Sequence, residues 1–224
     1  GAGTPAGPGL APGPVRRVHA PVLEDVDGFF AAVERRMDPP TRLRALGARL
    51  VDGAAYNRIL YAAVEKGGNA LLNCAMLECG AGAWRRALLA LADPGSGVVL
   101  LHCARGKDRT GVASALVQLA AMEPRASIVR AYAASARILA GRPDPGPGPG
   151  REARGDAVDW SSLRGSPAEA MERLLDYVEG RGGVDALAAD LGAGPDWSAR
   201  VRAARGAAGR PVSAPEAAFR GESP

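Results

Sequence analysis

The chain of 224 residues has few cysteines and no long apolar run. Three cysteines are too few, and odd in number, for a disulfide framework, so a reducing, cytoplasmic location is the simplest interpretation. No stretch approaches the roughly 18–20 uninterrupted apolar residues that a membrane helix needs. We therefore expect no transmembrane segment.

Aromatic residues and lysines are also scarce. Aromatics make up 4% of the chain, and no basic run is interleaved with them, so we expect no nucleic-acid partner. Lys66 and Lys107 are the only lysines, and arginine supplies almost all of the positive charge behind the formal net charge of +4. A mildly basic balance suits an anionic substrate. The sequence does not indicate an oligomeric state.

Glycine and proline cluster in two places instead of being spread along the chain. Residues 1–14 form a predicted flexible lead-in, and residues 141–157 form a predicted low-complexity insertion. The length suits one domain with a substantial core. We expect that domain over residues 15–203, followed by a flexible tail over 204–224.

Apolar spacing predicts many helices and two strands. The β-branched residues from Val15 to Leu23 predict one strand. The short apolar run from Val98 to Leu101 follows a turn and is typical of a strand buried on both faces. Leu43, Leu46 and Leu50 share one helical face, which we expect to be part of the core. Helices are expected from Phe29 to Pro39-Pro40, over 41–92 with breaks at Gly67-Gly68 and near Gly80, over 110–119, over 124–139, and from a Ser166 cap to 178 and then to 191.

The segment after the second predicted strand, residues 102–111, reads His-Cys-Ala-Arg-Gly-Lys-Asp-Arg-Thr-Gly. Cys103 stands at the carboxyl end of the strand, where open α/β sheets bind their ligands. Gly106 allows the loop to curl so that backbone N–H groups surround an anion. The helix that follows presents its positive end to the same anion, and that field lowers the pKa of the thiol.

Other side chains of this segment suit phosphate chemistry. Arg109 lies six positions after Cys103, so its guanidinium can bind two phosphate oxygens. Thr110 can donate its hydroxyl to the sulfur and help it to leave an intermediate. His102 and Gly111 are expected to orient the loop. The residues expected to line the phosphate are Ala104, Arg105, Gly106, Lys107, Asp108 and Arg109.

The pattern His-Cys-x-x-Gly-Lys-Asp-Arg-Thr-Gly resembles the signature of the protein tyrosine phosphatase superfamily. It is most similar to the atypical branch with Lys-Asp before the arginine, which includes bacterial, fungal and plant tyrosine or lipid phosphatases. Weaker resemblance extends over residues 15–195. The resemblance implies an α/β fold with a small, mostly parallel central sheet flanked by helices. The opening Asn-Phe-Arg-Asp-like segment of the family is not found before Val15, which leaves open an N-terminally truncated sheet.

The resemblance also implies a reaction. A phosphatase of this kind hydrolyses phosphomonoesters through a phospho-cysteine intermediate, without a metal or an organic cofactor. Expected substrates are phosphotyrosine, phosphoserine or phosphothreonine in proteins, or phosphoinositides. Asp108 is the preferred general acid in the Lys-Asp branch, whereas the wider superfamily order points to Asp25 or Asp27. We place Asp108 first and Asp25 second.

Other functions fit the segment less well. A nucleotide-binding loop would need Ser or Thr after Gly106-Lys107, where this chain has Asp108. A sulfurtransferase would not need Arg109 at this spacing. The spacings of Cys74, Cys79, His102 and Cys103 fit no closed zinc site, and the first two cysteines are expected to be core residues. A phosphate-binding module without turnover stays open as an alternative.

Overall fold

The computed structural model describes residues 15–140 and 163–207, and 72% of them are helical. The predicted lead-in at 1–14 and the predicted insertion at 141–157 lie outside these residues. In chain order the helical elements are α1 (Val26–Arg35), α2 (Pro39–Val51), α3 (Gly53–Cys79), α4 (Ala81–Leu91), the 3-10 turn η1 (Pro94–Ser96), α5 (Asp108–Ala120), α6 (Arg125–Leu139), α7 (Ala168–Gly180), α8 (Val184–Asp190) and α9 (Trp197–Ala207).

The predicted α/β fold with a central parallel sheet is wrong for the described residues. Residues 15–140 and 163–207 contain no strand. A segment forms a β-strand only when a neighbouring strand pairs with its backbone N–H and C=O groups. Neither predicted strand has such a partner among the described residues. Val98 and Leu100, expected to be buried on both faces of a sheet, are 89% and 84% exposed.

Most of the predicted helices are confirmed, because their ends follow local chemistry. Asp25 caps α1 by accepting a hydrogen bond from the Gly28 amide at 2.8 Å. Asp38 caps α2, whose first residue is Pro39, a position where proline costs no hydrogen bond. The predicted break at Gly67-Gly68 is a kink inside α3, where Gly68 has a φ of 55° that a side chain would disfavour.

The predicted capping role of Ser166 is wrong. Pro167 occupies the cap position of α7, and the helix begins at Ala168. The Ser166 hydroxyl is therefore one residue too early to reach the free N–H groups of the first turn. At the other end of the chain, α9 continues to Ala207, beyond the predicted end of the domain at 203.

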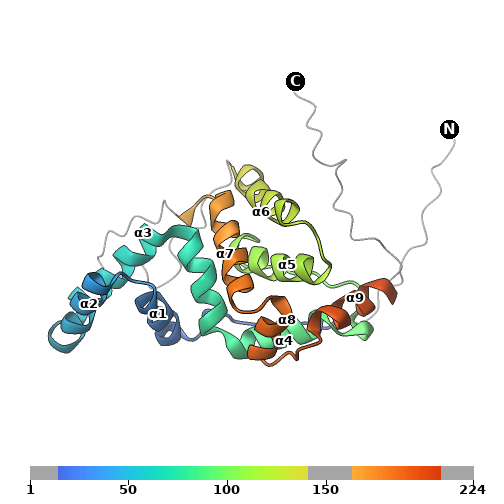
Figure 1. Cartoon of the computed structure of the whole chain (residues 1–224), viewed down its shortest axis with the longest axis horizontal. Coiled ribbons are helices and arrows are strands. Elements are labelled where there is room, and N and C mark those ends of the chain that lie inside the picture. Colours follow the sequence, from blue (N-terminus) through green and yellow to red (C-terminus); the bar gives the residue numbers. More distant parts are fainter. Residues whose placement is uncertain (1–14, 141–162, 208–224) are drawn as a thin grey trace, which may run out of the picture.

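The main apolar core surrounds α5, which packs against α3, α6, α8 and α9 (Figure 1). Leu116 of α5, Leu174 of α7 and the rings of Trp84 and Trp197 are almost fully buried in it. This core fixes the direction of α5. Because the candidate loop leads directly into α5, the core also fixes the loop's last residues.

A smaller apolar cluster joins α1 to α3, with Val33, Leu60 and Val64 at its centre. Helix α2 packs on α3 and, to a smaller extent, on α1, beside this cluster (Figure 1). The predicted core face of α2 is wrong, since Leu43 and Leu50 are exposed and Ala45 is the buried residue of that helix. The apolar spacing of α2 predicted that its leucines would be buried, but Ala45 is the residue that faces the protein interior.

No helix within residues 15–140 and 163–207 combines the length and apolar character needed to cross a membrane.

Candidate active site

The candidate loop joins residues 97–101, of which 97–100 are exposed, to the start of α5. Cys103 is half-buried in it. Gly106 has a φ of 68°, in the left-handed region that glycine adopts without strain, and this residue turns the chain back toward Cys103. The first turn of α5 closes when the Gly111 amide donates to the Lys107 carbonyl at 2.6 Å. The predicted order of loop and helix is thus confirmed, although no strand precedes it.

Hydrogen bonds converge on the Cys103 sulfur. Burial by itself raises the pKa of this thiol, but donors around the sulfur outweigh it. They are the backbone N–H groups of Thr110, Arg105 and Lys107, and the Thr110 side chain acts on the sulfur in the same direction. The pKa of Cys103 therefore lies below its usual range, which favours the thiolate.

Cys74 and Cys79 are in a different environment on α3. Both side chains are buried, and burial raises the pKa of each thiol to about 11. The prediction that they are core residues is confirmed by their burial. Cys103 is the only one of the three cysteines whose environment favours the reactive ionised form.

Arg109 stands at the second position of α5, directly after Asp108. Its side chain is half-buried, and its positive charge acts on the Asp108 carboxylate. We find no hydrogen bond or ion pair that commits its guanidinium to another described residue. The guanidinium is therefore available for a bound anion beside Cys103.

Asp108 is the first residue of α5 and is mostly buried, with a side chain 24% exposed. Burial raises the pKa of its carboxyl group, and the cations of Lys107, Arg105 and Arg109 only partly oppose this effect. The net pKa lies above the usual range for aspartate. A carboxyl group of this kind keeps its proton at higher pH than an exposed one, as a general acid requires.

A buried polar pair from two other helices reaches Asp108. Tyr132 of α6 lies close enough to the Asp108 carboxylate for that charge to act on its phenol, and its hydroxyl accepts from the Asn73 amide of α3 at 3.4 Å. Burial, together with Asp108, raises the pKa of Tyr132 to about 12, so the phenol stays protonated. The ring packs against Gly111, where a Cβ atom would stand 2.7 Å from ring carbon Cδ2. Gly111 thus gives Tyr132 access to Asp108.

The Lys107 side chain points into the protein. It is 1% exposed, and its ammonium donates to the backbone carbonyls of Leu163 and Gly165, the latter at 2.7 Å. It also lies 3.4 Å from the Asp108 carboxylate. The loop is in this way joined to the turn that precedes α7.

The remaining predicted site residues lie as follows. His102 and Ala104 are exposed, and Arg105 is half-buried. Asp25 serves as the cap of α1, and its charge acts on the buried thiol of Cys79. Of the two predicted acids, Asp108 is the one whose contacts lie within the loop.

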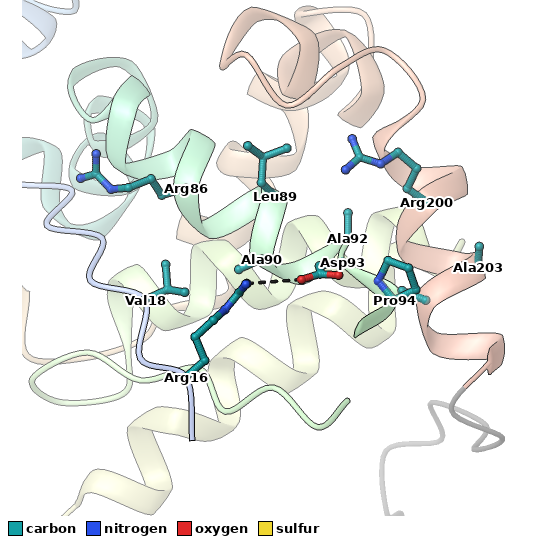
Figure 2. Close-up of a pocket in the computed structure, with 11 residues that line it drawn as sticks. Arg16, Val18, Arg86, Leu89, Ala90, Ala92, Asp93, Pro94, Arg200 and Ala203 are labelled. Carbon is teal, nitrogen blue, oxygen red and sulfur yellow. Dashed lines mark hydrogen bonds and ion pairs between the residues drawn. The ribbon is translucent and has the colours of Figure 1, made fainter. Parts of the chain in front are cut away.

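An open pocket of 620 Å³ lies at a different place, between residues 16–18, α4, η1 and α9 (Figure 2). Arg16 crosses it and pairs with Asp93 at 3.3 Å, and Arg86 and Arg200 stand at its edges. None of its lining residues belongs to the loop at 102–111. We therefore place the candidate chemistry at Cys103 and not in this pocket.

Comparison with known proteins supports this placement. The model of a family described as the tyrosine phosphatase family matches residues 12–204. The chain belongs to the tyrosine phosphatase family. The resemblance inferred from the loop sequence is thereby confirmed, and membership supports a phosphatase function.

A curated relative of this tyrosine phosphatase family member is "Tyrosine-protein phosphatase" of Nostoc commune. The two are 47% identical over 53 residues, which are 24% of this chain and 18% of the relative. The match thus spans less than a fifth of the relative's length. No solved structure matches the chain.

Sequence reasoning missed three polar residues around the site: Asn69, Asn73 and Tyr132. Asn69 and Asn73 lie among apolar residues in the second half of α3, and both are buried. A buried asparagine is unusual unless it is hydrogen-bonded, so two of them four residues apart were an available signal. Their partners could not be named without the fold.

Proposed function

We propose that this chain hydrolyses phosphomonoesters through a phospho-cysteine intermediate, with Cys103 as the nucleophile. The observation that carries the proposal is the convergence of backbone N–H groups on the Cys103 sulfur, which lowers the pKa of its thiol. A thiolate of this kind is the form that attacks phosphorus. Membership of the tyrosine phosphatase family supports the same assignment.

The backbone amides of residues 104–109 and the guanidinium of Arg109 bind the phosphate in this proposal. The first turn of α5 adds the favourable end of its dipole. The charge that develops on the transferred phosphoryl group is stabilised by Arg109 and the amides. This mechanism requires no metal ion or organic cofactor, because those groups supply the positive charge.

In the first step the Cys103 thiolate attacks phosphorus and the bond to the leaving oxygen breaks. Asp108 donates its proton to that oxygen, and the alcohol or phenol departs. In the second step a water molecule attacks the phosphoryl group on sulfur and gives a proton to the Asp108 carboxylate. The sulfur leaves as a thiolate, which the Thr110 hydroxyl stabilises.

Hydrolysis of para-nitrophenyl phosphate tests this proposal. The wild type and Cys103→Ser are compared with and without EDTA, and melting curves show whether both are folded. We expect EDTA-resistant turnover in the wild type and none in the variant. Equal turnover in the two proteins would exclude Cys103 as the nucleophile.

The substrate class is a finer part of the proposal. We place phosphotyrosine in proteins first, since family membership supports it, and phosphoserine, phosphothreonine and phosphoinositides after it. A phosphotyrosine peptide and a phosphoinositide competing for the same enzyme separate the two classes. A cytoplasmic, reducing location suits the proposal because an oxidised Cys103 could not attack phosphorus.

A second candidate function is phosphate binding without turnover. The exposure of Val98 and Leu100 favours it, because these two residues of the chain that leads into the loop are not covered by other described residues. Under this alternative, a protein that melts cooperatively would be protected by phosphate from alkylation at Cys103 but would not hydrolyse para-nitrophenyl phosphate.

A further inference from the structure

The Lys107 ammonium is the most deeply buried charge of the candidate site. Its side chain is 1% exposed and donates to the carbonyl oxygens of Leu163 and Gly165. A buried cation is costly unless acceptors and an opposite charge surround it. The two carbonyls and the Asp108 carboxylate at 3.4 Å meet that need. The side chain is thus committed to the protein interior.

The same turn is held from a second side. The carbonyl of Gly165 also accepts a hydrogen bond from the Asn69 side-chain amide at 2.5 Å. Asn69 is buried and directly follows the kink of α3 at Gly68. The carbonyl of Gly165 is therefore a common acceptor for a residue of the loop and a residue of α3.

The backbone of Lys107 takes part in the site as well. Its N–H is one of the donors to the Cys103 sulfur, and its carbonyl accepts the Gly111 amide at 2.6 Å. A side chain that fixes Lys107 therefore also fixes a donor to the nucleophile. An error of about 1 Å in such a position can reduce turnover on the order of 100-fold.

We propose that Lys107 is a positioning residue of this site, whose ammonium anchors the loop to the turn at Leu163–Gly165 and does not bind the substrate phosphate. The effect on turnover rests on the proposed function, whereas the anchoring itself can be measured on the Cys103 thiol alone.

Removal of the Lys107 charge should also change the titration of Asp108. The charged groups that face Asp108 are Lys107, Arg105 and Arg109, and the Tyr132 phenol lies near it. A cation favours the ionised carboxylate, so its loss raises the pKa of Asp108, by about one unit at this separation. In the variant, Asp108 then keeps its proton to a higher pH than in the wild type, so the alkaline fall in turnover begins at a higher pH.

The experiment compares Lys107→Met with Lys66→Met. Lys66 is the chain's other lysine and is exposed on α3, so the pair makes a matched control. The rate of Cys103 alkylation by iodoacetamide is followed against pH, with mass spectrometry of the cysteine-containing peptides. We expect an upward shift of about one pH unit in the midpoint for Lys107→Met and none for Lys66→Met.

Asn69→Ala separates anchoring from phosphate binding, because Asn69 carries no charge and holds the same turn. We expect it to shift the Cys103 midpoint in the same direction as Lys107→Met. The double variant should then show less than the sum of the two shifts, since both act through Gly165. An Asn69→Ala profile equal to that of the wild type, with weakened phosphate protection in Lys107→Met alone, would overturn the proposal.

Turnover of para-nitrophenyl phosphate gives the second readout. Lys107→Met should lower kcat on the order of 10–100-fold with a smaller change in KM, and should move the alkaline limb of the pH profile upward. If Lys107→Met fails to fold, Lys107→Arg and Asn69→Ala carry the test. Absence of turnover in the wild type would contradict the proposed function, while the alkylation shifts would still decide the role of Lys107.

Discussion

The three cysteines differ in environment strongly enough to differ in reactivity. The pKa of Cys103 is lowered by hydrogen bonds to its sulfur, whereas burial raises that of Cys74 and Cys79 to about 11. We predict that iodoacetamide near neutral pH modifies Cys103 first, and that Cys74 and Cys79 react only after unfolding. Mass spectrometry of the modified peptides measures this.

Urea provides the control for that prediction, because it should make all three cysteines equally reactive. Inorganic phosphate in the native protein should slow the modification of Cys103 alone. Rapid modification of Cys74 in the native protein would show that the second half of α3 is not buried in solution.

Gly111 makes a second prediction at the scale of one residue. A Cβ atom at this position would stand 2.7 Å from the Tyr132 ring, so Gly111→Ala must push the ring away from Asp108. We expect a loss of about 1–3 kcal/mol in the free energy of unfolding, together with reduced turnover. Urea denaturation and para-nitrophenyl phosphate hydrolysis measure the two effects.

Gly47 offers the matched control. It lies inside α2 with no atom within 4 Å of its Cβ position. Gly47→Ala should raise the free energy of unfolding by about 0.5–1 kcal/mol, because alanine loses less backbone entropy in a helix. If Gly111→Ala were equally harmless, the close packing of Tyr132 on α5 would be wrong.

The candidate site was predictable to the extent that it is local in sequence. Residues 102–111 form a curled loop and a helix start because glycine and helix geometry act over a few residues. The direction of the Lys107 side chain was not predictable, because its acceptors at Leu163 and Gly165 lie more than fifty residues away. Tyr132 and Asn73 were missed for the same reason.

At the scale of helices, Glu78 joins three of them. Its carboxylate near the end of α3 accepts from Arg35 at 2.8 Å and from Arg36 at 2.7 Å, both at the end of α1. Tyr177 of α7 donates to it at 3.0 Å, and the Arg36 guanidinium lies over the Tyr177 ring. Burial by itself would raise the pKa of Glu78, but its hydrogen bonds to Arg36 and Arg35 lower it to about 2.

This network predicts a specific dependence of stability on pH. In the unfolded chain Glu78 titrates near 4.5, and in the folded chain near 2, so its contribution is present above about pH 4.5 and is lost as the pH falls toward 2. We expect Glu78→Gln to lower the free energy of unfolding at pH 7 by about 1–3 kcal/mol. Urea denaturation at several pH values should show the gap to the wild type narrowing below pH 4.5. A difference in the free energy of unfolding that does not change with pH would show that the charge of Glu78 does not contribute to stability.

Helices and strands differed in how far the sequence could predict them. The starts of α1 and α2 depend on capping by Asp25 and Asp38 within three residues, so the information for them is local in the sequence, although these two caps were not predicted. The strand predicted from Val98 to Leu101 depends on partners elsewhere in the chain. An apolar run fits a buried strand, but without a neighbouring strand among the described residues it forms none, and Val98 and Leu100 stay exposed.

For the whole molecule, the consequence is an uneven distribution of stability. The helices around α5 bury most of the core, whereas the segment that leads into Cys103 contributes little burial. Leu116 of α5 is 1% exposed, whereas Leu100 is 84% exposed. The two leucines lie on either side of the loop at 102–111. Their substitution therefore compares the two regions directly.

We predict that Leu116→Ala lowers the free energy of unfolding by about 2–5 kcal/mol, because it leaves a cavity in the core. Leu100→Ser should change it by no more than about 0.5 kcal/mol, as expected for an exposed side chain. Urea denaturation of both variants measures the difference. A loss at Leu100 as large as that at Leu116 would contradict the exposure of Leu100 and show that its side chain is covered in solution.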